Sequence, residues 1–196
     1  MCGRFLLDDD PNNLAAVFDA SAQELPFSSE KTATPGMMIP VIRTSPDGKR
    51  EILPMRWGLI PSWAKDPKIG YKMFNARSET IQSKPSFAAP FRRSRCLIPA
   101  SGFYEWDHSG KTPVPYIFTL TDTHVFSFAG LYDQWKDPEG HTLLSCTVIT
   151  TAPNSLIAPI HDRMPVILPH EYHTQWLSGN TPETDLLPLL TPYPSD

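Results

Sequence analysis

The sequence lacks several features that would each mark a class of protein. It contains no run of 18 apolar residues, so no segment is long enough to span a membrane as a helix. Its start carries Arg4 and the acidic run Asp8 to Asp10 where a secretory signal would be apolar. It also shows neither an internal repeat nor a low-complexity linker. These absences indicate a single domain that covers residues 1–196. They also indicate a reducing location, which we expect to be the cytoplasm, with the protein at the nucleoid in a bacterium or in the nucleus in a eukaryote.

Cysteine is scarce and irregularly spaced. Cys2, Cys96 and Cys146 form no CxxC pair. An odd number of cysteines without an export signal argues against a disulfide framework and against a structural zinc site. We therefore expect no metal and no other cofactor.

Proline, by contrast, is abundant, at 22 of 196 residues, which is about twice its usual share. Each proline fixes φ and removes a backbone donor, so the composition excludes a helix bundle or a coiled coil. We predict an α+β fold: a β-rich, mostly antiparallel curved sheet or open barrel with short peripheral helices. The expected strands are 38–43, 51–57, 96–106, 114–120, 124–131 and 142–150, with turns at 45–48, 107–110 and 137–140. The expected helices are 11–20, 76–83, 153–159, 169–178 and 182–190, the last capped by Thr181.

The charge is distributed unevenly along the chain. The formal net charge is −4, yet residues 43–95 hold twelve Lys and Arg against four Asp and Glu. Such a basic section could form a phosphate-binding face, and an ordinary solvated surface explains it equally well. Trp57 and Trp63 lie in this section, where we expect them in the core, with base stacking beside Arg56 as the alternative.

Cys2 is the residue whose position carries the most chemistry. Removal of Met1 would expose an α-amine and a thiol on adjacent carbons. Because an α-amine has a pKa of about 7.7–8.0 against about 10.4 for lysine, far more of it is nucleophilic at pH 7. An amine forms a Schiff base with an aldehyde, and the neighbouring thiol can then close a durable thiazolidine ring. The alternative is that a cysteine stands second in the chain by chance.

Asn75 and Arg77 form a second cluster. Asn75 is a plausible cap for a helix that begins at this point. In the functional interpretation, Asn75 orients a reactive group and Arg77 holds an anion at the helix N-terminus.

Glu105 and His161 supply possible proton-transfer groups. Glu105 lies in an alternating segment in which Phe103 shares its face, and burial among aromatic rings would raise its pKa into a useful range for a proton donor. His161 lies between two prolines, and histidine is the usual proton shuttle near pH 7. The alternatives are an exposed strand glutamate and an ordinary loop histidine.

Taken together, these segments resemble the SRAP family (SOS response-associated peptidase), whose members shield abasic sites in DNA. The matching segments run in the family's order and cover residues 1–165: 1–5, 57–63, 75–80, 96–106 and 161–165. The segment after about residue 180 carries no matching motif. The resemblance implies a β-rich domain with a positively charged groove that binds single-stranded DNA, or a single/double-strand junction, containing an abasic site. It implies no membrane association, and a single chain suffices, so we expect a monomer.

The resemblance also assigns roles to individual residues. It implies that Cys2 is the nucleophile, freed by loss of Met1, and that its product is a covalent DNA–protein crosslink. An N-terminal-nucleophile peptidase or amidase that removes its own Met1 is the alternative, and a non-covalent single-strand binding module is a third. The implied catalytic residues are Cys2, Asn75, Glu105 and His161. The implied DNA contacts are Arg4, Arg77 and Arg163 to phosphates, and Pro40 and Trp106 to the bases beside the lesion.

Overall fold

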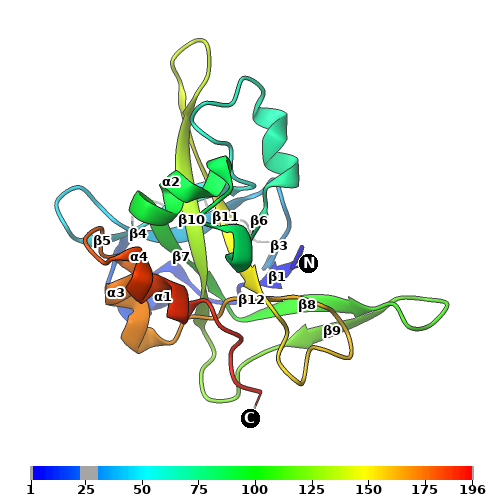
Figure 1. The fold of residues 1–196 in the computed structure, drawn as a ribbon. Helices are drawn as coiled ribbons and strands as arrows, with labels where there is room; N and C mark the ends of the chain where they lie inside the picture. The colour runs from blue at the N-terminus through cyan, green and yellow to red at the C-terminus, as the bar shows by residue number, and fades with distance from the viewer. Residues whose placement is uncertain (1, 23–30, 196) are drawn as a thin grey trace.

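A closed barrel of five strands forms the centre of the computed structural model, which describes residues 2–22 and 31–195 (Figure 1). Around the barrel, β5 pairs with β4, β4 with β7, β7 with β10 and β10 with β11, all antiparallel. A short parallel pairing of Cys146 with Trp57 joins β11 back to β5 and closes the ring. The five strands are β4 (Met38–Thr44), β5 (Arg50–Trp57), β7 (Arg95–Ala100), β10 (Phe126–Lys136) and β11 (Thr142–Thr151). The expected β-rich, mostly antiparallel fold is confirmed, with a barrel that is closed where we expected an open one.

Alternate side chains of the barrel strands point inward and form its core. Ile39, Met55, Ile98, Phe128 and Val148 all belong to one buried cluster. The intervening side chains face outward, as strand geometry requires. Cys2 and Phe5 belong to the same inner cluster, so the start of the described chain packs against the barrel interior.

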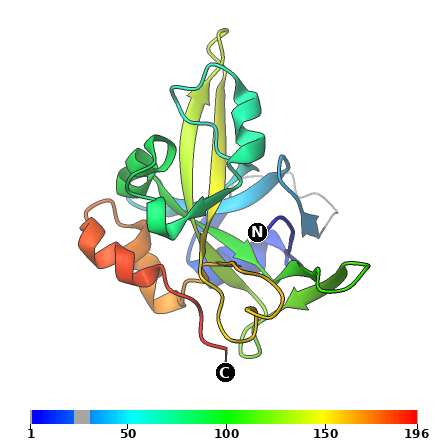
Figure 2. The same cartoon turned by 45° about the vertical axis from the view of Figure 1, so that its right-hand side comes forward.

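A second, smaller sheet lies against the barrel and carries the chain's first strand. Its order is β3–β1–β8–β9, with β1 (Phe5–Leu6) in the interior of the sheet. Figure 1 and Figure 2 show the hairpin of β8 and β9 projecting away from the rest of the molecule. The other strands of this sheet are β3 (Thr32–Ala33), β8 (Gly102–Asp107) and β9 (Val114–Phe118), and β2 (Ser21–Ala22), β6 (Asn75–Arg77) and β12 (Met164–Pro165) extend the barrel sheet.

Short helices cover one outer face of the barrel. Phe18, Phe91 and Trp176 pack there against outward-facing residues such as Leu97 and Ile149. The helices are α1 (Pro11–Phe18), α2 (Pro85–Arg93), α3 (His173–Leu177) and α4 (Glu183–Leu186), with 3-10 turns η1 (Pro67–Lys72), η2 (Ser78–Thr80), η3 (His170–Tyr172) and η4 (Leu187–Leu189). None of the helices in the described ranges has the length and apolar character needed to cross a membrane.

Several local predictions were wrong. The expected helix at 76–83 is instead strand β6 followed by the single turn η2, and 153–159 forms turns. The expected strand 96–106 divides at Ser101, whose amide donates to Leu6 of β1, so that its two halves enter different sheets. Thr181 does not cap α4, which begins after Pro182. Trp57 is buried as expected, whereas Trp63 is 60% exposed.

Candidate active site

Strand pairing holds the first residues of the described chain. Phe5 pairs with β3 on one side and with Phe103 of β8 on the other. The Tyr104 amide donates to the Arg4 carbonyl over 2.9 Å, which extends the pairing toward the chain start. Cys2 is thereby fixed at the place where the small sheet meets the barrel core.

The Cys2 thiol is fully buried. Loss of hydration, together with repulsion from the Glu105 carboxylate, raises the pKa of the thiol to about 12. A thiol with so high a pKa is protonated at pH 7. The site therefore maintains a neutral thiol rather than a thiolate. Cys2, Cys96 and Cys146 are all free cysteines.

Asn75 contacts the backbone of Cys2 directly. Its Nδ2 donates to the Cys2 carbonyl oxygen over 2.9 Å. Asn75 reaches this position because β6 runs parallel to β11, with Asn75 opposite Val148. The expectation that Asn75 caps a helix is therefore wrong. Its buried Oδ1 accepts no hydrogen bond from any residue in the described ranges.

Glu105 lies on the buried face of β8. Glu105 is 3% exposed and shares that face with Phe103, while Tyr104 and Trp106 are half-buried on the other face, as the alternation predicted. Removal of the carboxylate from water raises the pKa of Glu105. A protonated carboxyl group near neutral pH can donate a proton to a reacting oxygen.

His161 faces Glu105 from the loop before β12. Its Nε2 lies 3.9 Å from Glu105 Oε2. The Arg163 amide donates to His161 Nδ1 over 2.9 Å, while the exposed Asp162 carboxylate lies 3.1 Å from the same nitrogen. Nδ1 therefore lies beside both a hydrogen-bond donor and a carboxylate acceptor. Nε2 is the ring nitrogen that faces Glu105.

The structure gives Arg163 a different environment from the one that the resemblance implied. The residue is 9% exposed, and its guanidinium donates twice to the Glu79 carboxylate, over 2.6 and 2.9 Å. It also donates to the Thr150 carbonyl over 2.7 Å. These contacts use the two terminal nitrogens, while the buried Nε has no hydrogen-bond partner among the described residues. Arg163 therefore anchors the loop that carries His161 to β11 and η2, and its contact with a phosphate stays a prediction.

Replacing Glu79 by glutamine tests this anchor. We expect Glu79→Gln to lower the free energy of unfolding by about 1–2 kcal/mol, because Arg163 stays buried while its partner is half exposed. The Arg163 guanidinium holds the pKa of Glu79 below its usual range, so its contribution is present above about pH 4.3 and is lost at lower pH. Urea unfolding should show a larger difference in the free energy of unfolding between wild type and variant at pH 7 than at pH 3. A difference of equal size at both values would contradict the ion pair.

Arg4, Trp106 and Arg77 lie where a ligand could reach them. The Arg4 guanidinium lies 5.4 Å from the centre of the Trp106 ring. Arg4 and Arg77 are exposed, and Trp106 is half-buried. These two cations are therefore open to an anionic chain, whereas Arg163 is 9% exposed.

Pro40 is not brought to this site. It lies in β4 opposite Pro54, between Ile39 and Val41. Those two neighbours pack in the same inner cluster as Cys2, so the alternation of the strand directs Pro40 to the other side. The implied contact of Pro40 with a base beside the lesion is therefore not supported by its position.

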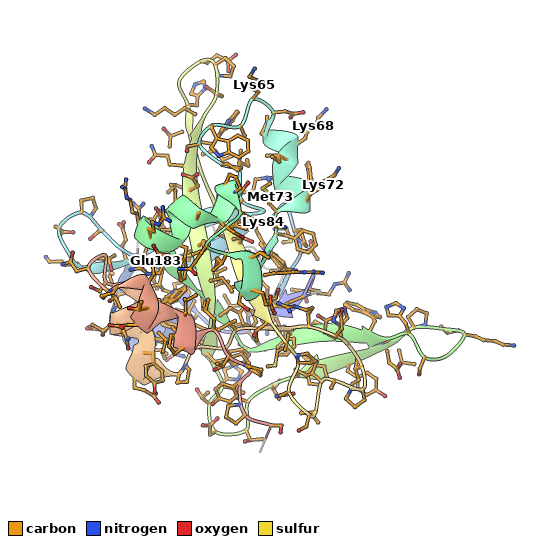
Figure 3. All side chains as sticks on the ribbon, in the orientation of Figure 1. Lys65, Lys68, Lys72, Met73, Lys84 and Glu183 are labelled. Carbon is orange, nitrogen blue, oxygen red and sulfur yellow. The ribbon has the colours of Figure 1, made fainter. Side chains whose placement is uncertain are left out.

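The basic section of the sequence divides between structural and exposed cations. Arg43 pairs with Glu51, Arg92 pairs with Glu183, and Arg95 is buried against backbone carbonyls. Arg43 and Arg95 therefore do not belong to an open cationic face, whereas Arg92 stays exposed beside its Glu183 partner. The exposed cations of the section include Lys65, Lys68, Lys72 and Lys84, which Figure 3 labels, and Arg77.

Sequence reasoning missed the partners that hold the His161 loop in place. Glu79 lies in a segment that we singled out, yet only its contact with Arg163, 84 residues away, reveals a role. Thr150 carries no sequence signal, since its contribution is a backbone carbonyl. No short-range pattern could have identified either residue.

One group of possible metal ligands occurs in the described part of the chain, far from Cys2 in sequence. Asp137, Glu139 and His141 lie at the turn between β10 and β11, with their ligand atoms within 4.8 Å of one another. Asp137 already accepts hydrogen bonds there from the amide and the ring of His141. The hydrogen bonds of the turn therefore explain why these three side chains lie close together.

The comparisons with known proteins agree with the sequence resemblance. The family described as "SOS response associated peptidase (SRAP)" matches residues 1–196. The chain is 46% identical to the abasic site processing protein YoqW of Bacillus subtilis, over 100% of this chain and 89% of that protein. It is 38% identical to the abasic site processing protein HMCES of Xenopus tropicalis, over 74% of this chain and 50% of that protein.

Solved structures show the same fold. A crystal structure of a protein from Bacteroides thetaiotaomicron superposes with a TM-score of 0.92 at 30% identity, over 99% of this chain and 88% of that one. A second, from Bordetella bronchiseptica, has a TM-score of 0.86 at 30% identity, over 99% and 95% of the two chains. With its family match extending from the first residue to the last, this chain belongs to the SRAP family.

Proposed function

We propose that this protein recognises abasic sites in DNA and binds them covalently through Cys2 after loss of Met1, which shields the lesion in the DNA damage response. The observation that carries the proposal is the convergence of Cys2, Asn75, Glu105 and His161 from four separate segments. Relatives named abasic site processing proteins support the same substrate. The domain acts as one unit over residues 1–196, as a monomer, in the nucleoid or nucleus where that DNA lies.

The reaction begins with the sugar. An abasic deoxyribose is mostly a closed hemiacetal, and Glu105 assists its opening to the aldehyde by proton transfer. The α-amine of Cys2 attacks C1′, and the resulting carbinolamine loses water to give a Schiff base. The Cys2 sulfur then bonds to C1′ while the thiol proton moves to the nitrogen, which closes the thiazolidine. No oxidant, reductant or metal is consumed.

Asn75 and His161 support these steps. Asn75 Nδ2 holds the Cys2 carbonyl, which limits rotation of the residue that must present both nucleophiles. His161, whose Nε2 faces Glu105, exchanges protons with that carboxyl group during ring closure and its reversal. In this order the amine attacks first, so the first step does not require a thiolate.

Binding involves the sugar-phosphate chain of single-stranded DNA or of a junction with duplex. Arg4 and Arg77 neutralise phosphates, and Trp106 packs against a base beside the lesion, supported by the Arg4 guanidinium at its ring. An abasic nucleotide has no base to flip, so its entry costs little unstacking energy. Binding of this kind weakens as salt rises, in proportion to the number of phosphates contacted.

Intact mass spectrometry tests the proposal. Processed protein mixed with a single-stranded oligonucleotide carrying one abasic site should gain the mass of that oligonucleotide less one water, and the adduct should survive denaturation. The matched control is the same oligonucleotide with a tetrahydrofuran in place of the abasic sugar, which has no aldehyde and should add no mass. Absence of an adduct on the aldehyde-bearing strand, with Met1 verified as removed, would refute the covalent mechanism.

The peptidase alternative has less support. An N-terminal cysteine peptidase needs the thiol as attacking group, and the pKa of about 12 leaves it almost fully protonated while the chain retains Met1. Turnover of a peptide panel by the mature protein, without any adduct on abasic DNA, would favour this alternative.

A further inference from the structure

Tyr116 of β9 lies directly across the strand pair from Glu105. The two residues are register partners in the antiparallel pairing of β8 with β9. Residues opposite one another in such a pair share a face, with Cβ atoms about 5 Å apart. Tyr116 and the carboxyl group that the proposed reaction uses therefore lie on the same face of the hairpin.

The two partners differ sharply in exposure. Glu105 is 3% exposed, whereas Tyr116 is 43% exposed. The edge strand β9 belongs to a hairpin that projects from the molecule, and the loop that leads to β12 runs beside this hairpin in both views (Figure 1, Figure 2). Tyr116 thus presents an aromatic surface to solvent at the outer border of the Glu105 and His161 site.

Ile117, on the opposite face of the hairpin, is a suitable control residue for Tyr116. Ile117 is 47% exposed, nearly the same as Tyr116, but pairs with Tyr104 and lies on the other face. Both residues belong to the same edge strand, and neither is part of the inner core cluster. A change that affects Tyr116 and not Ile117 would therefore report on the face that carries Glu105.

We infer that Tyr116 contacts the substrate by stacking on the nucleotide base next to the abasic sugar. The inference rests on the proposed function, which places the abasic sugar at Glu105 and its neighbours within reach of the Tyr116 ring. A base beside an abasic nucleotide has lost a stacking partner within the DNA. An aromatic side chain can replace that partner for any base, since every base has a π-face.

The stacking contact of Tyr116 is tested by equilibrium binding of protein variants to strands that have, or lack, each base beside the lesion. Fluorescence anisotropy with a tetrahydrofuran-containing single strand measures binding without covalent reaction. We expect Tyr116→Ala to bind about tenfold more weakly than wild type, and Tyr116→Phe and Ile117→Ala to stay within about twofold. In strands that also lack the base on the 5′ or the 3′ side of the lesion, the Tyr116→Ala penalty should disappear for one side and persist for the other.

The outcomes separate this inference from the proposed function. If wild type crosslinks to an aldehyde-bearing strand but Tyr116→Ala binds within twofold of wild type, the stacking contact is refuted and the covalent mechanism stands. A penalty that persists in both base-deleted strands, or one that Ile117→Ala reproduces, also refutes the contact. If wild type forms no adduct, the proposed function fails independently of Tyr116.

Discussion

Cys2→Ala protein should lose the durable DNA adduct and keep the ability to form an imine. After removal of Met1 the variant still presents an α-amine, which condenses with the sugar aldehyde. It lacks the sulfur that closes the ring, so its Schiff base hydrolyses on denaturation. We expect the denaturation-resistant adduct to fall on the order of 100-fold, and borohydride reduction to recover it by converting the imine to an amine. Denaturing gels with and without borohydride measure both quantities.

Cys146→Ala is the matched control for this experiment. Cys146 is as deeply buried as Cys2 and belongs to the same inner cluster, but it lies inside the chain and has no free amine. Its substitution should leave the adduct yield unchanged. If Cys2→Ala, with Met1 removed, crosslinks as well as wild type without reductant, the thiol has been wrongly assigned.

Glu105→Gln is expected to have the second largest effect. The amide has nearly the shape of the carboxyl group but cannot transfer a proton. General acid–base catalysis typically contributes 10²–10⁴-fold, so we expect the single-turnover crosslinking rate to fall by about 100-fold or more while DNA binding is retained. The control is Asp107→Asn, which removes a carboxylate two residues along the same strand and should leave the rate within about twofold of wild type.

The pH dependence gives a second test of Glu105. Its pKa is raised by burial, so its protonated form persists above the usual range and declines as pH rises through the raised value. The Cys2 amine changes in the opposite sense, because it gains nucleophilicity as pH rises toward about 8. Wild type should therefore show a bell-shaped rate profile, and Glu105→Gln should show only the rising limb. Identical profile shapes for the two proteins would exclude Glu105 as the acid.

Short-range patterns predicted the strands well. The turn at 45–48 and the turn at 137–140 each separate two β-rich runs, and both are hydrogen-bonded turns in the structure. Gly48 and Gly140 adopt positive φ, a conformation that glycine reaches without strain. Turn chemistry and alternation act over a few residues, so they can be recognised without knowledge of the fold.

Helices were predicted less well because long-range contacts outweighed local preference. The segment that contains Asn75 looks like a helix start, yet it pairs with β11, more than 70 residues later. Helix α2 begins at Pro85 and contains Pro90, a residue that sequence rules keep out of helix interiors. Its aromatic residues Phe87 and Phe91 are buried in the outer cluster, which stabilises the helix despite the proline.

The residue types of the site could be read from the sequence, but their arrangement could not. The position of Cys2 behind Met1, the alternation around Glu105 and the prolines around His161 each suggested chemistry. The 3.9 Å approach of His161 to Glu105 and the hydrogen bond from Asn75 to Cys2 depend on strand pairing between distant segments. The same long-range packing placed Arg163 in an ion pair with the half-exposed Glu79 and Pro40 on the outer side of its strand.

By itself, the sequence determined that the chain is β-rich. It also determined which reactive groups are present: an aminothiol at the second position, a carboxyl group among aromatic rings, and an imidazole. Only the tertiary structure decided which of them meet. These groups come together because the barrel closes through β5 and β11 and because β1 inserts between β3 and β8. The physical reason is that proton transfer requires contact within a few ångströms, whereas sequence patterns constrain only neighbours along the chain.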